Sequence, residues 1–224
     1  MSSESPKQAL FAQFAAVAKA VAHPHRLALL EQLAQGERSV EVLADRTRVS
    51  VANASQHLQH LRRAGLVAAR RDGKFVFHRL ADDDAVLGLL TSLRRIAELQ
   101  SAEVERVVRS YFNDRDSLEA VSRPELMDRL KAGIVTVLDV RPEDEFALGH
   151  LPGAINLPLS ELERRLADLD PGREIVAYCR GPYCVLSYEA VAMLRARGFK
   201  VRRLEDGLPE WRAAGLPVEG STSA

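Results

Sequence analysis

Apolar side chains recur at helical spacing in two segments near the start of the chain. The first segment is expected to be a helix that ends before His23. The second is expected to begin near Pro24, a residue that suits the first turn of a helix, and to end at Gly36. The positions that define these faces are Leu10, Phe14 and Val17, then Leu27, Leu30 and Leu33.

A short helix, a turn and a second helix follow. Ser39 can cap the short helix, and Ser50 can cap the next one, which runs through Arg63. Two strands come after them, and the Asp72-Gly73 pair between the strands is a strong hairpin signal. This order predicts a winged helix-turn-helix, in which the second helix of the pair packs on the core with one face and reads DNA with the other.

The helix that begins after Ser50 divides into two faces. Its buried face is expected to hold Val51, Ala54, Leu58 and Leu61. The residues expected to reach bases or phosphates, on this helix and on the wing, are Asn53, Ser55, Gln56, Gln59, Arg62, Arg63, Arg70, Arg71 and Lys74. The alternative is an exposed polar helix that binds protein or nothing.

A single long amphipathic helix is predicted over 82–112. Its apolar stripe needs a partner surface, which is either a second copy of the chain or the chain's own second domain. Residues 113–121 are polar and are expected to form a linker. Beyond the linker, β-rich runs at 134–140, 174–179 and 200–204 alternate with helical stretches, which indicates a parallel α/β sheet.

The predicted architecture therefore has two domains. A mainly α-helical winged helix-turn-helix domain for DNA binding and dimerisation covers 1–112, and an α/β domain with a central parallel sheet covers 122–224.

Composition and charge sharpen this picture. The 224 residues carry no net charge, yet residues 40–80 hold 8 Lys and Arg against 3 Asp and Glu. A local basic patch in a neutral chain favours a confined polyanion-binding surface, although a solvated charged face explains it equally well. No apolar run approaches the length of a membrane helix, and the first residues lack the layout of a secretory signal, so a cytoplasmic location without membrane association is expected.

The run from His23 to Leu80 resembles the ArsR/SmtB family of dimeric bacterial repressors. The resemblance implies that double-stranded DNA and a second copy of the chain are partners. Inducers of that family bind at cysteine, histidine or acidic clusters. Here residues 1–112 contain no cysteine and the helix predicted over 82–112 contains no histidine, so no metal site and no cofactor are expected.

Cys179 and Cys184 are the only cysteines. Cys179 ends a predicted strand, and a loop and a helix follow it, which would place the thiol near backbone N–H groups and the positive end of a helix. Such a thiol is expected to have a lowered pKa and to be a thiolate near neutral pH. A buried structural cysteine is the alternative.

Three separated runs resemble the rhodanese family: VLDVRPEDEFALGHLPGAINLP at 137–158, YCRGPYC at 178–184 and GLPEWRAAGLPV at 207–218. The resemblance implies that Cys179 carries sulfur as a persulfide and that Asp139 and Arg141 support the site. It also implies an active-site loop made of Arg180, Gly181, Pro182, Tyr183, Cys184 and Val185.

The loop departs from familiar relatives in two ways. Gly181 stands at the second position after the cysteine, whereas many active rhodaneses have glycine at the third. Cys184 could act as a resolving thiol that attacks a persulfide on Cys179, or it could simply pack at the start of a helix. Val185 occupies the position where a Cys-x5-Arg phosphatase needs arginine, which disfavours that class.

Two functions remain open at this stage. One is a repressor that responds to sulfane sulfur or redox state through Cys179, with thiosulfate or polysulfide as the donor. The other is a thiosulfate or persulfide sulfurtransferase with an attached DNA-binding module.

Overall fold

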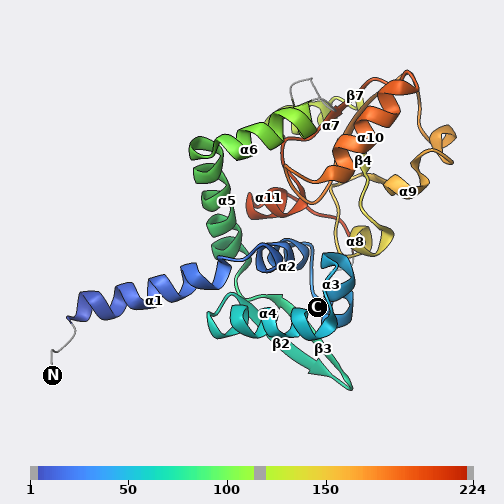
Figure 1. Ribbon diagram of the computed structural model, residues 1–224. Helices are drawn as coiled ribbons and strands as arrows, with labels where there is room; N and C mark the ends of the chain where they lie inside the picture. The colour runs from blue at the N-terminus through green and yellow to red at the C-terminus, as the bar shows by residue number, and fades with distance from the viewer. Residues whose placement is uncertain (1–4, 114–119, 221–224) are drawn as a thin grey trace. The chain divides into compact units, whose positions relative to one another are not determined.

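The computed structural model describes residues 5–113 and 120–220 and divides into two compact units, Met1–Thr91 and Ser92–Ala224 (Figure 1). This division falls inside one helix. The domain limits expected from the sequence, with a linker over 113–121, stay a prediction, and 114–119 lie outside the described residues.

The first unit is a winged helix-turn-helix, as predicted. Its elements are α1 (Pro6–Val21), α2 (Pro24–Ala34), β1 (Arg38–Ser39), α3 (Val40–Thr47), α4 (Val51–Arg63), β2 (Val67–Asp72), β3 (Phe75–Leu80) and the first half of α5 (Asp83–Gln100). The strands form an antiparallel sheet in the order β1-β3-β2. Gly73 has a φ of 59°, which a tight hairpin requires and glycine supplies at little cost.

Two serine caps set the helix-turn-helix. The Ser39 hydroxyl accepts a hydrogen bond from the Val42 N–H, and the Ser50 hydroxyl accepts one from the Asn53 N–H at 3.2 Å. Each satisfies a backbone donor that the first helical turn leaves unpaired. Leu43, Leu58 and Leu61 then close the core between the two helices.

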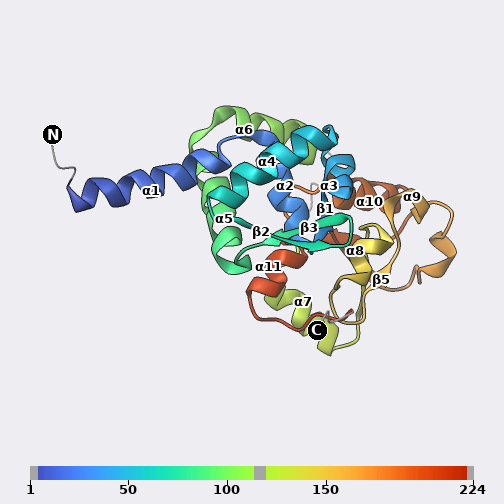
Figure 2. The ribbon, with the colours of Figure 1, turned by 90° about the horizontal axis from the view of Figure 1, so that it is seen from below.

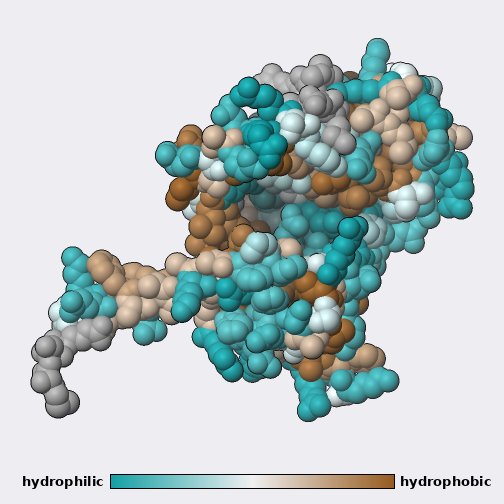
Figure 3. All heavy atoms as spheres, viewed as in Figure 1, coloured by the Kyte–Doolittle hydropathy of each residue, from teal (hydrophilic) through white to brown (hydrophobic). Residues whose placement is uncertain are grey.

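Helix α1 projects from the other helices of its unit in both ribbon views (Figures 1 and 2). Leu10, Phe11 and Phe14 on this helix are each more than half exposed. Figure 3 shows hydrophobic colours along it. Within this single chain the apolar face of α1 is therefore largely uncovered.

The prediction of one helix over 82–112 is wrong. Helix α5 ends at Gln100, α6 covers Ala102–Val107, and a π-helix covers Val108–Asn113. Ser101 separates α5 from α6 because it is extended and its hydroxyl accepts a hydrogen bond from the Val104 N–H at 3.2 Å. A serine that caps a new helix interrupts the old one, although the apolar spacing continues across it.

The second unit is an α/β domain with a four-stranded parallel sheet in the order β5-β4-β6-β7, which confirms the predicted fold class. After the helical segment that starts at Ser92, its elements are α7 (Arg123–Lys131), β4 (Val135–Asp139), α8 (Glu143–Ala147), β5 (Ile155–Asn156), α9 (Leu159–Leu162), a 3-10 turn (Leu166–Asp168), β6 (Glu174–Tyr178), α10 (Val185–Ala196), β7 (Val201–Arg203) and α11 (Leu208–Ala213). The helical stretch between β5 and β6 is thus divided into two short pieces, α9 and the 3-10 turn.

Separate apolar clusters flank this sheet. One cluster contains Ile175, Ala177 and both cysteines, and the other contains Val176, Tyr178 and Trp211. Alternate residues of β6 therefore point to opposite faces, as the two-residue period of a strand requires. Within the described parts of the chain, no helix is both long enough and apolar enough to cross a bilayer.

Candidate functional site

Cys179 lies at the carboxyl end of the central strand β6. Its neighbour Tyr178 pairs with Asp139, the last residue of β4. The ends of parallel strands meet at one edge of a sheet, and sites in α/β folds form there. Cys179 is 1% exposed. Its backbone oxygen accepts a hydrogen bond from the Leu208 N–H, which ties the start of α11 to the same edge.

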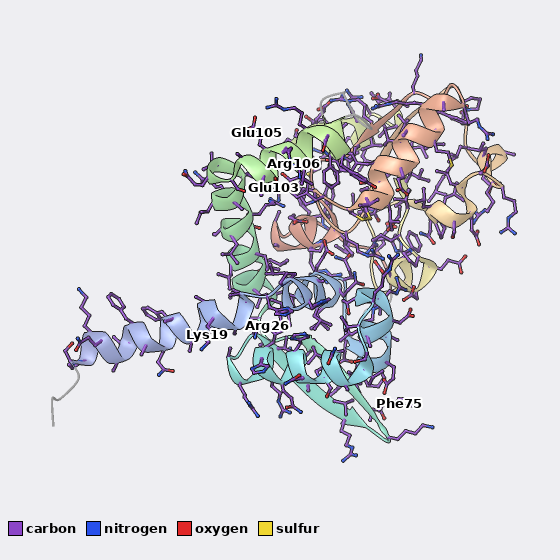
Figure 4. The ribbon with its side chains drawn as sticks, in the orientation of Figure 1. Lys19, Arg26, Phe75, Glu103, Glu105 and Arg106 are labelled. Atoms are coloured by element: carbon purple, nitrogen blue, oxygen red, sulfur yellow. A yellow bond between two sulfur atoms is a disulfide. The ribbon has the colours of Figure 1, made fainter. Side chains whose placement is uncertain are left out.

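Cys179 and Cys184 form a disulfide, with their Cα atoms 6.1 Å apart (Figure 4, yellow bond). Cys184 is the residue immediately before α10, and it is 7% exposed. The loop closes on itself because the Cys184 N–H donates to the Gly181 oxygen at 3.1 Å, while the Ser187 N–H donates to the Cys184 oxygen. The disulfide therefore closes the loop between the end of β6 and the start of α10.

Arg180, the first residue of the loop, is tied to a carboxylate. Its guanidinium donates three hydrogen bonds to Glu145 of α8, the shortest 2.7 Å from Nη2 to Oε1. The Glu145 side chain is fully buried and the Arg180 side chain is 16% exposed. The positive charge that the sequence places beside Cys179 is therefore balanced by a negative charge.

Asp139 and Arg141 form a second buried pair, next to Tyr178 at the end of β6. The Arg141 Nη2 atom donates to Asp139 Oδ2 at 2.6 Å and to the Gly149 oxygen at 2.7 Å, and both side chains are fully buried. Tyr178 donates its hydroxyl to the same carboxylate. Burial and the Asp139 charge raise the pKa of Tyr178, so its hydroxyl keeps the proton it donates. These side chains are bonded to one another, which fits a supporting role.

Gly207 supports the loop from behind. A Cβ at this position would lie 2.3 Å from the Arg180 carbonyl carbon and 2.4 Å from the Gly181 nitrogen. No side chain fits there, so the backbone before α11 packs directly on the Arg180–Gly181 peptide. Glu210 completes this support because its carboxylate accepts a hydrogen bond from the Gly207 N–H at 3.1 Å.

The rest of the loop is half-buried or exposed. Gly181, Pro182 and Tyr183 are partly exposed, and Val185 is 37% exposed. Tyr183 donates its hydroxyl to Glu98 Oε1 at 2.8 Å. The sequence analysis named every residue of this loop but missed Glu145, Gly207, Glu210 and Glu98, because their contacts with the loop join segments that are distant along the chain.

In the first unit, α4 exposes the face that the sequence predicts. Asn53, Gln56, Gln59, Arg62 and Arg63 are exposed, and Ser55 is half-buried. The prediction that Val51 belongs to the buried face is wrong, because it is 48% exposed. Val51 is the first residue of α4, so the helical period reaches the core only from the next turn, at Ala54.

The basic residues of the wing differ in their contacts with carboxylates. Arg70 donates to both oxygens of Glu37, with Nη2 2.6 Å from Oε2, and its Nη1 donates to Asp72. Arg71 and Lys74 are exposed, and Lys74 lies 5.2 Å from the ring centroid of Phe75 at the hairpin turn (Figure 4). Arg70 must therefore leave a carboxylate before it can bind a phosphate.

Three imidazole rings gather where α2 meets α4. The ring centroids of His23 and His57 are 4.5 Å apart, and those of His25 and His57 are 5.8 Å apart. Burial, followed by the charges of His23 and Arg26, lowers the pKa of His57. Across residues 5–113 and 120–220, no three His, Cys, Asp or Glu side chains are arranged to hold a metal ion.

Comparison with known proteins identifies both units. A family model described as a rhodanese-like domain matches residues 122–214, and one described as a helix-turn-helix domain matches 21–70. The HTH-type transcriptional regulator Rv0324 of Mycobacterium tuberculosis is 46% identical over 95% of this chain and 93% of its own length. A sulfurtransferase of Allochromatium vinosum is 34% identical over 38% of this chain and 78% of its own length.

Two solved structures are each similar to part of the chain. A homodimeric winged helix-turn-helix DNA-binding domain from Mycobacterium bovis is 40% identical, with a TM-score of 0.40, and covers 46% of this chain and 95% of that one. A rhodanese-related protein from Thermoplasma volcanium is 28% identical, with a TM-score of 0.42, and covers 46% of this chain and all of that one.

Proposed function

This chain belongs to the ArsR-type helix-turn-helix transcriptional regulators and carries a rhodanese-like domain. We propose that it is a dimeric DNA-binding repressor whose affinity for DNA responds to sulfane sulfur or oxidation at Cys179. The observation that carries the proposal is the Cys179–Cys184 disulfide at the end of β6. Two cysteines that can close on each other give the loop two covalent states, which a sulfur donor or an oxidant can interconvert.

The chemistry starts from the form with both thiols free, which a thiol reductant produces from the disulfide, and it needs a sulfur donor. The Cys179 thiolate attacks the outer sulfur of a donor such as thiosulfate, forms a persulfide and releases sulfite. The Cys184 thiolate then attacks Cys179 Sγ, the bond to the outer sulfur breaks, and hydrosulfide leaves as the disulfide forms. With a polysulfide donor, a shorter polysulfide leaves in the first step. No cofactor takes part.

The DNA-binding half of the proposal rests on α4 and the wing. Gln56, Gln59 and Asn53 lie on the exposed face of a helix that Ser50 caps, and amide side chains can bond adenine with both of their polar atoms. Arg62, Arg63 and Arg71 are exposed beside them for phosphate contacts. A second copy of the chain is the proposed cover for the apolar face of α1.

A sulfurtransferase with an attached DNA-binding module is the second candidate. It is favoured by the match of 85 residues to the Allochromatium sulfurtransferase and by the rhodanese-like family model at 122–214. The two candidates use the same cysteine. They differ in whether the state of Cys179 changes the affinity for DNA.

The deciding experiment measures DNA binding and sulfur loading together. Wild type, Cys179→Ser and Cys184→Ser are titrated by fluorescence anisotropy against a duplex selected by the wild-type protein from a randomised pool, with and without sodium tetrasulfide. The regulator proposal expects a tetrasulfide-dependent change of Kd that Cys179→Ser loses. If tetrasulfide adds sulfur-atom mass to Cys179 but does not change the Kd for DNA, the regulator proposal is wrong and the sulfurtransferase is favoured.

Cys184→Ser tests the second step. If Cys184 resolves the persulfide, the variant should keep a longer-lived persulfide on Cys179, which peptide mass mapping detects. If product and lifetime match wild type, Cys184 only packs at the start of α10.

A further inference from the structure

The second half of α5 contacts the loop that follows Cys179. Glu98 Oε1 of α5 accepts the Tyr183 hydroxyl at 2.8 Å, and Tyr183 is the neighbour of Cys184. All three residues belong to the unit Ser92–Ala224. The loop that holds the sulfur chemistry is therefore bonded to a helix outside the rhodanese-like fold matched at 122–214.

The same stretch of α5 also reaches the back of the loop. Arg94 Nε lies 3.5 Å from Glu98, and Arg94 Nη1 lies 3.8 Å from Glu210 Oε1. Glu210 in turn accepts the N–H of Gly207, the residue that packs on the Arg180–Gly181 peptide. Polar contacts thus link Tyr183 in the loop, through Glu98 and Arg94 of α5, to Glu210. Glu210 bonds the backbone that packs on the loop.

The environment keeps Tyr183 in the form that donates. Burial and the Glu98 hydrogen bond raise the pKa of Tyr183 to about 12, so the hydroxyl is protonated at neutral pH. The Phe112 ring, 5.2 Å from the Tyr183 ring and 4.7 Å from that of Tyr188, holds the tyrosine from another side. The position of Tyr183 therefore depends on the Glu98 hydrogen bond, on the Phe112 ring and on the conformation of the loop that carries it.

Helix α5 is shared by the two units. Its residues from Ser92 onward belong to the second unit, while its first turns belong to the first. Val86 is 2% exposed in the core of the first unit, and Leu87 and Leu90 pack against that core. A displacement of one end of a continuous helix acts on whatever the other end packs against.

We propose that Glu98 senses the sulfur state of the loop through Tyr183 and that α5 conveys this state to the winged helix-turn-helix. This inference rests on the proposed function and assigns its route. In the disulfide form, Cys184 is bonded to Cys179, and the loop holds the Tyr183 hydroxyl on Glu98. With sulfur on Cys179 or both thiols free, Cys184 loses that bond and Tyr183 loses the restraint. The contact then differs in free energy between the two states, which is what coupling requires.

The test uses the full-length chain, the selected duplex and sodium tetrasulfide. Glu98→Ala removes the acceptor and should load sulfur on Cys179 as wild type does. The change of Kd that tetrasulfide causes should be about threefold to tenfold smaller in this variant than in wild type, the range expected for one lost hydrogen bond. Glu103→Ala on α6 is the control because its carboxylate is 68% exposed and pairs only locally, with Arg106 (Figure 4). It should keep the wild-type change of Kd.

Two further variants make the result specific to the Tyr183–Glu98 contact. Glu98→Gln keeps an acceptor oxygen and should retain most of the wild-type change of Kd. Adding Tyr183→Phe to Glu98→Ala should cause no further loss, because both substitutions remove the same hydrogen bond, the one from the Tyr183 hydroxyl to Glu98. A wild-type change of Kd in Glu98→Ala, or independent losses in the double variant, overturns the route while the sulfur response stands. A wild-type Kd indifferent to tetrasulfide overturns the route and the proposed function together.

Discussion

Arg180 and Glu145 form an ion pair beside Cys179, with Arg180 Nη2 2.7 Å from Glu145 Oε1 and the carboxylate fully buried. The pair joins the loop to α8 and fixes the first residue after the cysteine. A buried carboxylate without this partner would be costly, and so would an arginine left beside a thiol without its counter-charge. The geometry of the loop after Cys179 therefore depends on a side chain from a different sequence motif, Glu145.

Glu145→Ala should destabilise the rhodanese-like unit by about 3 kcal/mol, because it removes the buried carboxylate that accepts the hydrogen bonds of the Arg180 guanidinium. Urea unfolding followed by circular dichroism measures the loss. Glu143→Ala, on the exposed side of the same helix, is the control and should change stability by less than about 0.5 kcal/mol. Equal stability of the two variants would mean that the ion pair does not hold the loop.

Gly207→Ala should destabilise the same unit by about 1–3 kcal/mol and slow sulfur loading on Cys179, since the added methyl group overlaps the Arg180–Gly181 peptide. The backbone at 207 has a φ of −110°, so the effect is steric and owes nothing to backbone strain. Gly88→Ala in α5, where an added Cβ meets no atom within 4 Å, is the control and should be neutral or stabilising. Unchanged loading kinetics in Gly207→Ala would refute the tight packing of the loop.

The sequence predicts well what short-range chemistry decides. Ser39 and Ser50 cap their helices, Asp72-Gly73 turns the hairpin, and Cys179 directly follows a strand that ends at Tyr178, one residue earlier than predicted. Each of these features depends on only a few neighbouring residues. The prediction fails where two local signals compete. At Ser101 a capping hydroxyl overrides an apolar spacing that runs straight on.

Contacts between distant segments account for the other misses. Glu145, Glu98 and Glu210 each look like an ordinary charged residue on a helix, and only the fold brings them to the loop. The strand β5, with two residues, is too short to show a period. The sequence therefore predicted the fold and the loop that follows Cys179, but not the carboxylates that contact this loop.

Gln56→Ala should weaken binding to the selected duplex by about 1–3 kcal/mol and relax its base preference, because a paired contact to one base is lost. Anisotropy titrations against the selected and a scrambled duplex measure both effects. Glu41→Ala, at an exposed position of α3, is the control. Should Gln56→Ala bind both duplexes as wild type does, Gln56 does not read bases.

Arg71→Ala should lower the slope of log K against log salt by about 0.9, the value for one phosphate contact. Arg70→Ala should change the slope less, because Arg70 already donates to Glu37 and Asp72 and must give up those bonds to reach DNA. The two substitutions remove the same group from adjacent positions of β2, which makes each the control of the other. A larger slope change for Arg70→Ala would show that the Glu37 pair opens freely on DNA.

Acidification should destabilise the winged helix-turn-helix through two histidines. Burial, followed by the charge of Arg62, lowers the pKa of His78, whose side chain is buried in β3 with Nδ1 unpaired, and burial lowers that of His57. A base with a lowered pKa in the folded state takes up protons more readily when unfolded. The stabilising contribution is therefore complete above the unfolded value of about 6.5 and is lost as the pH falls through that value toward the folded pKa.

His78→Leu should flatten this dependence, because the buried position then has no proton to gain. Thermal unfolding of the full-length chain between pH 7 and pH 5 measures the change in Tm, and the variant should lose less stability over that interval than wild type. His60→Leu, at an exposed position of α4, is the control and should keep the wild-type slope. If His78→Leu and wild type lose the same stability on acidification, the buried imidazole is not the group that titrates, and the cluster around His57 becomes the remaining source.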